Sequence, residues 1–207
     1  MGKPVTEIAK AVIQTEADSI LLLKDRIDQK FDESCHLLAA CKGKVILIGM
    51  GKSGHIAKKI ASTLSSTGTP SFYMHPGEAG HGDLGVIAEN DVVIMISYSG
   101  ESDEMISLLP GIKRINVPII SMTGNSNSSI GMSSQFHLDV SVKKEACPNN
   151  LAPTSSTTAA LVMGDAIAIS LININNFSSD DFAMSHPSGT LGRRLLTFVS
   201  SIMKTGK

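Results

Sequence analysis

The sequence predicts an α/β protein of three layers, in which helices flank both faces of a doubly wound, five-stranded parallel sheet. From residue 45 onward, short runs of β-branched and other apolar residues alternate with segments of helical periodicity, a pattern typical of such sheets. Two of the apolar runs end in turns rich in Gly and Ser, at residues 49–54 and 97–102. Because ligands of doubly wound sheets bind beyond the carboxyl ends of the strands, we expect a functional site at these turns.

Apolar residues recur at helical intervals over residues 5–40, which predicts one or two helices there. The last expected helix is apolar nearly all round, which predicts that it is buried. The chain therefore divides into an N-terminal helical segment, residues 1–44, which packs on the sheet domain or on a neighbouring subunit, and a sheet domain, residues 45–207. Within the sheet domain we expect strands at 45–48, 71–74, 91–97, 117–122 and 136–142, helices at 55–65, 103–114 and 154–171, and loops at 75–85 and 124–129.

Composition and charge restrict the class of protein. A chain of 207 residues with 42% hydrophobic and 18% charged residues is typical of one globular domain with a substantial core. The net charge of -1 argues against nucleic acid or an anionic membrane as a partner. No apolar run approaches the length of a membrane span, and the N-terminus does not resemble a secretory signal. The three cysteines match neither a disulfide framework nor a zinc motif, so the expected compartment is the cytoplasm.

The first strand end, Gly49-Met50-Gly51-Lys52-Ser53-Gly54, has the features of a phosphate site. Backbone N–H groups and the positive end of a helix dipole would converge there. The glycine spacing also fits a dinucleotide-binding fingerprint, but the next apolar run ends in His75 rather than in the required acidic residue. A nucleotide-triphosphate P-loop is excluded, because Ile46 stands where that motif needs a glycine. An ordinary strand-to-helix turn remains the alternative interpretation.

The second strand end offers three hydroxyl groups, on Ser97, Ser99 and Ser102, before a predicted helix. Hydroxyls and a helix N-terminus suit a phosphate ester, although such serines are also common N-cap and turn residues. A third hydroxyl-rich stretch lies at residues 154–158. The three stretches together favour a phosphorylated small molecule as the ligand.

Several other polar residues are candidates for chemistry. The loop at residues 75–85 contains His75 and His81, but no second cluster supports a metal site there. Glu145 follows the last expected strand, where catalytic carboxylates of such sheets are found; a solvated Glu among lysines is the alternative. His186 lies in a turn made rigid by Pro187.

These motifs together resemble the sugar isomerase (SIS) domain of the bacterial arabinose-5-phosphate isomerases. The resemblance covers nearly the whole chain, because matching motifs occur in order at residues 49–55, 75–85, 97–102, 145–148, 151–158 and 185–192. It implies a flavodoxin-like fold, a homotetramer with sites shared between subunits, and a phosphorylated pentose as substrate. Many relatives carry two CBS modules after the isomerase domain, and this chain ends about where they would begin.

The resemblance also implies a reaction, the interconversion of D-arabinose 5-phosphate and D-ribulose 5-phosphate through an enediolate. Members of the family thereby supply precursor for the Kdo sugar of lipopolysaccharide or of capsules. A phosphosugar sensor that binds without turnover is the alternative, although residues 1–44 show no basic recognition helix of a DNA-binding regulator. A nicotinamide-dependent oxidoreductase is a third reading that depends on the glycine pattern alone.

Such an isomerase needs a base and an oxyanion donor but no redox cofactor. By resemblance, Glu145 is the favoured base and Glu104 its rival. His81 or His186 would open the sugar ring, and Lys52 would stabilise negative charge. The sequence does not decide which carboxylate is the base or which histidine opens the ring. Neither a metal nor a cofactor is expected. The resemblance assigns substrate binding to Gly51, Ser53, His75, Ser97, Ser99, Gly100, Ser102 and Thr157.

Two positions depart from the family pattern. Tyr98 stands where many relatives have Asn, and Ser188 where Gly or Ala is frequent. Tyr98 is expected to alter packing at the phosphate end of the site.

Overall fold

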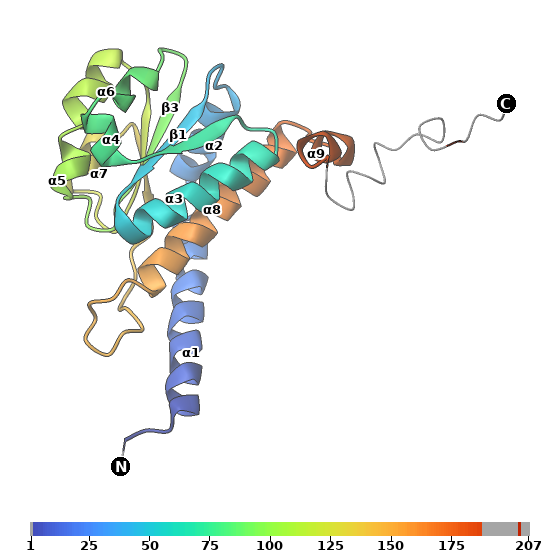
Figure 1. The fold of residues 1–207 in the computed structure, drawn as a ribbon. Helices are drawn as coiled ribbons and strands as arrows, with labels where there is room; N and C mark the ends of the chain where they lie inside the picture. Colours follow the sequence, from blue (N-terminus) through green and yellow to red (C-terminus); the bar gives the residue numbers. More distant parts are fainter. Residues whose placement is uncertain (1, 188–202, 204–207) are drawn as a thin grey trace.

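The structure is a computed structural model that describes residues 2–187 and residue 203. A five-stranded, all-parallel sheet forms its middle layer (Figure 1). In the spatial order β2-β1-β3-β4-β5, the chain leaves β1 toward β2 on one side and leaves β3 toward β4 on the other. The loops after β1 and β3 therefore run in opposite directions at the carboxyl edge, where such sheets bind their ligands. The strands are Val45–Gly49 (β1), Ser71–Met74 (β2), Val92–Ile96 (β3), Ile119–Thr123 (β4) and Phe136–Asp139 (β5). The predicted fold class is confirmed.

Helices cover both faces of the sheet (Figure 1). On one face lie α2 (Gln29–Ala39), α3 (Gly51–Ser66) and α8 (Ser155–Ile174). The opposite face is covered by α4 (Pro76–Gly80), η2 (Asp83–Val86), α5 (Asp103–Ile106), α6 (Leu109–Ile115) and α7 (Ser129–Ser133). Two more helices, α1 (Val5–Leu23), which continues into η1 (Lys24–Arg26), and α9 (Ser179–Ser185), lie toward the ends of the chain.

The central strands are buried on both faces, which explains their uninterrupted apolar sequences. Alternate residues point to opposite layers. Leu47 and Ile94 pack toward α3 and α8, whereas Ile48 and Met95 pack toward α5 and α6. The two apolar cores therefore fix the register of the sheet and the position of its carboxyl edge.

The helix α8 corrects the expectation that no apolar run is long enough to cross a membrane. It is 20 residues long, an 18-residue window of it has a mean hydropathy of 1.6, and it is the one such helix in the described part of the chain. Met163, Ile167 and Leu171 are nevertheless buried in the core beside α3. Gly164 lies so close to Ile60 of α3 that a Cβ atom would overlap that side chain. This is the arrangement of a core helix, as its all-round apolar sequence predicts.

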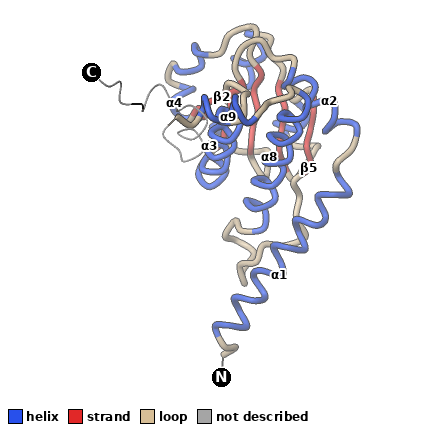
Figure 2. Tube along the Cα trace, turned by 90° about the vertical axis from the view of Figure 1, so that its right-hand side faces the viewer, coloured by secondary structure: helices blue, strands red, loops and turns tan. Residues whose placement is uncertain are grey.

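The helix α1 packs on α8 at its C-terminal half, while its N-terminal half extends beyond the rest of the domain (Figures 1 and 2). Thr158 of α8 donates a hydrogen bond of 2.7 Å to Glu16 of α1. Farther toward the N-terminus, Val5 is 81% exposed and Ile13 is 70% exposed. Part of the helix therefore packs on its own domain, while apolar side chains at the free end face outward.

Several element boundaries differ from the prediction. The helix α3 begins at Gly51, four residues before the expected start, so Lys52 and Ser53 lie in its first turn. The helix expected at 103–114 is divided into α5 and α6, because Pro110 lies in the first turn of α6 and excludes a continuous helix. The expected loop at 75–85 contains α4 and η2, β5 ends at Asp139 rather than at 142, and α9 was not predicted.

Candidate functional site

The turn between β1 and α3 is held tightly against the sheet. Gly51 has a φ of +55°, which favours glycine. A Cβ atom on Gly54 would lie 2.6 Å from the Gly49 carbonyl oxygen, and the Tyr73 hydroxyl donates to that same oxygen at 3.0 Å. The first backbone N–H groups of α3, including those of Lys52 and Ser53, have no acceptor within the helix. The turn thus offers donors at the carboxyl edge, and the exposed Lys52 adds a positive charge.

The loop after β3, residues 97–102, brings the predicted serines together and is called the serine loop below. Ser97 is only 4% exposed, and its hydroxyl lies 3.1 Å from that of Ser102. The Gly100 N–H donates to the Ser97 hydroxyl at 3.2 Å, and the Glu101 N–H donates to the Ser99 hydroxyl at 3.2 Å. Hydroxyls and backbone amides that bond to one another in this way are the groups that hold a phosphate ester.

The sequence did not single out Glu101, which braces the serine loop. Its carboxylate accepts a hydrogen bond of 2.8 Å from the N–H of Ser129, in the first turn of α7. The hydroxyl and N–H of Ser129 lower the pKa of Glu101. Gly100, with a φ of +68°, packs so closely on Ser128 that a side chain would overlap it. The loop is therefore fixed to the start of α7.

Glu145 lies at the N-terminus of α8. Its Oε2 accepts hydrogen bonds from Thr154 N at 2.7 Å, Thr154 Oγ1 at 2.9 Å and Ser156 N at 3.3 Å. Partial burial alone would raise the pKa of Glu145, but the hydroxyl of Ser156 and these donors together lower it. The hydrogen bonds that this carboxylate makes within the described residues all end on Oε2. Oε2 thus anchors the side chain to the start of α8.

A cavity of about 40 Å³ connects these three elements. Ser53 of α3, Tyr98 of the serine loop and both Ser156 and Thr157 of α8 line it. The volume suffices for a few water molecules rather than for a sugar phosphate. The predicted Ser53 and Thr157 therefore meet the predicted serine loop, with Glu145 attached to the same helix end through Ser156.

Glu104, the rival carboxylate, and the loop histidines lie on the opposite face of the sheet from α3. Glu104 is exposed on α5, two residues after Ser102, and α4 packs against α5. His75 caps α4 by accepting from the Gly77 N–H at 3.1 Å, and His81 is exposed at the end of that helix. Both histidines follow β2, whose carboxyl end lies at the same edge of the sheet as those of β1 and β3, but neither lines the cavity.

His186 is placed elsewhere within one chain. Its ring stacks on Phe182 of α9, with centroids 3.9 Å apart, and its Nδ1 lies 3.0 Å from the Phe182 carbonyl oxygen. The helix α9 follows the C-terminal end of α8, which is roughly 26 Å from Thr157 at 1.5 Å per residue. Asn175, beyond that end, lines a cavity with Gly43 and Val45 at the amino edge of the sheet. The part of the His186 motif from Ser188 onward lies outside the described residues.

Among residues 2–187 and residue 203, no three His, Cys, Asp or Glu side chains gather into a group that could hold a metal ion. The polar groups at the carboxyl edge are instead hydroxyls, amides, one lysine and carboxylates. That set is able to bind an anion and to transfer protons.

Comparisons with known proteins agree with this chemistry. The model of the SIS domain family matches residues 37–170. The chain is 54% identical over 205 residues to the arabinose 5-phosphate isomerase KdsD of Escherichia coli K12, covering 99% of this chain and 62% of the relative. It is 53% identical over 199 residues to the protein of that name from Pseudomonas aeruginosa, covering 96% of this chain and 61% of the relative. The chain thus spans under two thirds of the length of these curated relatives.

A solved structure, that of c3406 from Escherichia coli CFT073 in complex with arabinose 5-phosphate, superimposes with a TM-score of 0.86. It is 42% identical in sequence, and the match covers 88% of this chain and 97% of the other.

Proposed function

Because the chain belongs to the SIS domain family, we propose that it is an isomerase that interconverts D-arabinose 5-phosphate and D-ribulose 5-phosphate. Relatives named arabinose 5-phosphate isomerase are about half identical to it, and a relative solved with arabinose 5-phosphate bound shares its fold. The observation that carries the proposal is the meeting of Ser53, the serine loop and the Glu145-capped end of α8 around one cavity.

The phosphate binds at the serine loop and the first turn of α3. Its oxygens accept hydrogen bonds from the hydroxyls of Ser53, Ser97, Ser99 and Ser102, in place of the bonds that the loop makes internally. Gly51 and Gly100 allow the backbone to approach the phosphate closely. Fixing this end orients the reacting carbons, which is a large part of the rate in such reactions.

Glu145 is the base. Its Oε1 takes the proton from C2 of the open-chain aldose, and the electron pair forms the enediolate between C1 and C2. Return of the proton to C1, with transfer of the hydroxyl proton from O2 to O1, yields the ketose. The lowered pKa of Glu145 keeps the carboxylate ionised near neutral pH, and Lys52 stabilises the developing negative charge. Glu104 is the carboxylate to test if Glu145 fails.

His81 or His186 opens the sugar ring, with His75 and Thr157 holding the substrate. His186 lies far from the cavity of its own chain, so its part in the reaction requires a neighbouring subunit. We therefore propose a homotetramer with shared sites. The exposed apolar side chains at the free end of α1, Val5 and Ile13, support a contact between subunits. The enzyme acts in the cytoplasm, and the interconversion supplies precursor for the Kdo sugar of lipopolysaccharide or of capsules.

The test is to incubate the purified chain with arabinose 5-phosphate in D₂O and to measure ribulose 5-phosphate by NMR. Turnover with deuterium incorporated at C1 of the product is expected. Binding of the sugar phosphate without turnover would instead identify a sensor, and absence of both would refute the proposal. Light scattering measures the oligomeric state in the same sample.

A further inference from the structure

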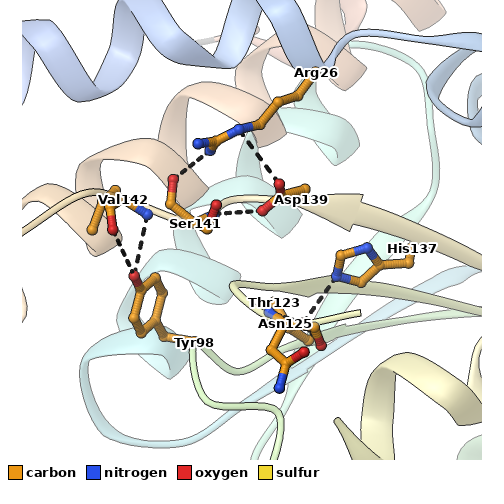
Figure 3. Close-up of polar contacts among 8 residues, drawn as sticks. All are labelled: Arg26, Tyr98, Thr123, Asn125, His137, Asp139, Ser141 and Val142. Carbon is orange, nitrogen blue, oxygen red and sulfur yellow. Dashed lines mark hydrogen bonds and ion pairs between the residues drawn. The ribbon is translucent and has the colours of Figure 1, made fainter. Parts of the chain in front are cut away.

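We propose that Tyr98 is a positioning residue that ties the serine loop to the segment carrying Glu145. The inference rests on the proposed function and adds a role that the serine motif does not contain. The Tyr98 hydroxyl accepts a hydrogen bond of 3.1 Å from Val142 N and lies 3.4 Å from Val142 O, to which it donates (Figure 3). Two bonds to the backbone of one residue fix the position of that residue against the serine loop.

The ring of Tyr98 is itself held in place. Gly124 lies directly beside it, and a Cβ atom on Gly124 would come within 2.9 Å of Tyr98 Cε2. The Gly124 N–H donates to the Tyr98 carbonyl oxygen at 2.8 Å. The side chain also lines the cavity shared by Ser53 and Thr157. Tyr98 is therefore a fixed part of the serine loop with its hydroxyl directed to the β5 side.

The segment after β5 depends on such contacts. The last backbone hydrogen bond between this segment and β4 joins Val140 N to Thr123 O at 3.0 Å. Arg26 holds the chain on either side of this bond, through Asp139 at the end of β5, at 3.4 Å, and through the carbonyl oxygen of Ser141 (Figure 3). Tyr98 holds the next residue, Val142, from the opposite side. The segment is thus fixed between the helical N-terminus and the serine loop.

Glu145 is only three residues beyond Val142, a span of about 10 Å at most. Its carboxylate is fixed at the other end by Thr154 and Ser156. A displacement of about 1 Å in a reacting group lowers turnover by up to about 10²-fold. The Tyr98 hydroxyl therefore sets where Glu145 lies relative to the substrate's phosphate, and it affects the chemical step more than phosphate affinity.

The test compares Tyr98→Phe, which removes only the hydroxyl, with Thr63→Val, which removes an outward hydroxyl on α3 that bonds within its own helix. For Tyr98→Phe we expect kcat to fall about tenfold, with KM within about twofold. Amide hydrogen exchange in the peptide spanning 140–146 should become faster, because Val142 N loses its acceptor. Thr63→Val should leave both quantities unchanged.

An unchanged exchange rate in Tyr98→Phe would overturn the tether, and an unchanged kcat would overturn its effect on Glu145. A rise in KM with kcat unchanged would make Tyr98 a substrate-binding group, which also overturns positioning. If the unaltered protein shows no isomerisation, the proposed function fails, whereas hydrogen exchange still decides whether Tyr98 anchors the segment.

Discussion

Replacing Glu145 with Gln tests the proposed base while retaining most of its structural role. The amide oxygen of Gln accepts hydrogen bonds from Thr154 N and Ser156 N as the carboxylate does, but it takes no proton from carbon. Removing a general base lowers kcat by about 10²–10⁴-fold. The lower figure alone corresponds to about 2.7 kcal/mol in the activation free energy.

The stability cost should be much smaller. A helix cap is worth about 1 kcal/mol, and Gln keeps part of it. For a chain of this length, a loss of 1 kcal/mol lowers Tm by about 2–4 °C. Since folded proteins are stable by about 5–15 kcal/mol, nearly all molecules stay folded. Loss of activity in Glu145→Gln therefore reports on chemistry rather than on unfolding.

The matched control is Asp28→Asn, which makes the same chemical change at the N-cap of α2. The Asp28 carboxylate accepts from Lys30 N at 2.9 Å and from Phe31 N at 3.3 Å. This variant should lower Tm by a similar amount and leave kcat unchanged. Steady-state kinetics and thermal unfolding of both variants provide the comparison. If Glu145→Gln keeps kcat within about threefold of the unaltered protein, Glu145 is not the base, and Glu104→Gln becomes the next variant to measure.

Three further predictions concern the same edge of the sheet. Ser99→Ala should raise KM for the sugar phosphate by about tenfold or more, because a hydrogen bond to a charged group is lost. The control is Ser65→Ala, at an exposed serine. Equal KM values for the two variants would remove Ser99 from the phosphate site. Gly54→Ala should destabilise the protein by about 1–3 kcal/mol, because the new methyl group meets the Gly49 carbonyl oxygen. Thermal unfolding measures this loss, with Gly80→Ala, where a Cβ meets open space, as the control. Equal Tm values for the two variants would contradict the packing argument. Because folding lowers the pKa of Glu145, its ionised form stabilises the protein above the unfolded-state pKa of about 4.3, and that contribution disappears as the pH falls through the lower folded-state value. The Tm difference between the unaltered protein and Glu145→Gln should therefore shrink below about pH 4, and a constant difference would show that the carboxylate charge does not stabilise α8.

The sheet and the position of the site were predictable because both depend on short-range patterns. Continuous apolar sequences such as those of β1 and β3 indicate strands that are buried on both faces. The Gly- and Ser-rich turns that follow these strands indicate the edge of the sheet where a ligand is expected to bind. The break between α5 and α6 was also encoded, in Pro110, although the apolar periodicity on either side concealed it. The early start of α3 depends on Gly51, whose positive φ allows the turn to enter the helix at once.

Contacts between distant segments were not predictable in this way. The bond from Val142 to Tyr98 joins residues 44 positions apart, and Glu101 braces a helix 28 positions away. Tyr98 stands out in the sequence only as a departure from the family pattern, and Glu101 does not stand out at all, so only the fold reveals which residues they contact. The same is true of His186, whose turn looks like a site motif while α8 carries it to the far end of the domain.

The close packing of Gly164 on Ile60 has a consequence for how the protein accommodates its ligand. Gly164 adds no side chain to this contact, so α3 and α8 lie close together there, and Lys59 and Asp165 form an ion pair across the same two helices. This packing holds the first turn of α3, with Ser53, against the capped end of α8. Of the segments at the carboxyl edge, residues 75–86 are not held by this contact between α3 and α8, so a change of shape on binding a sugar is expected there first.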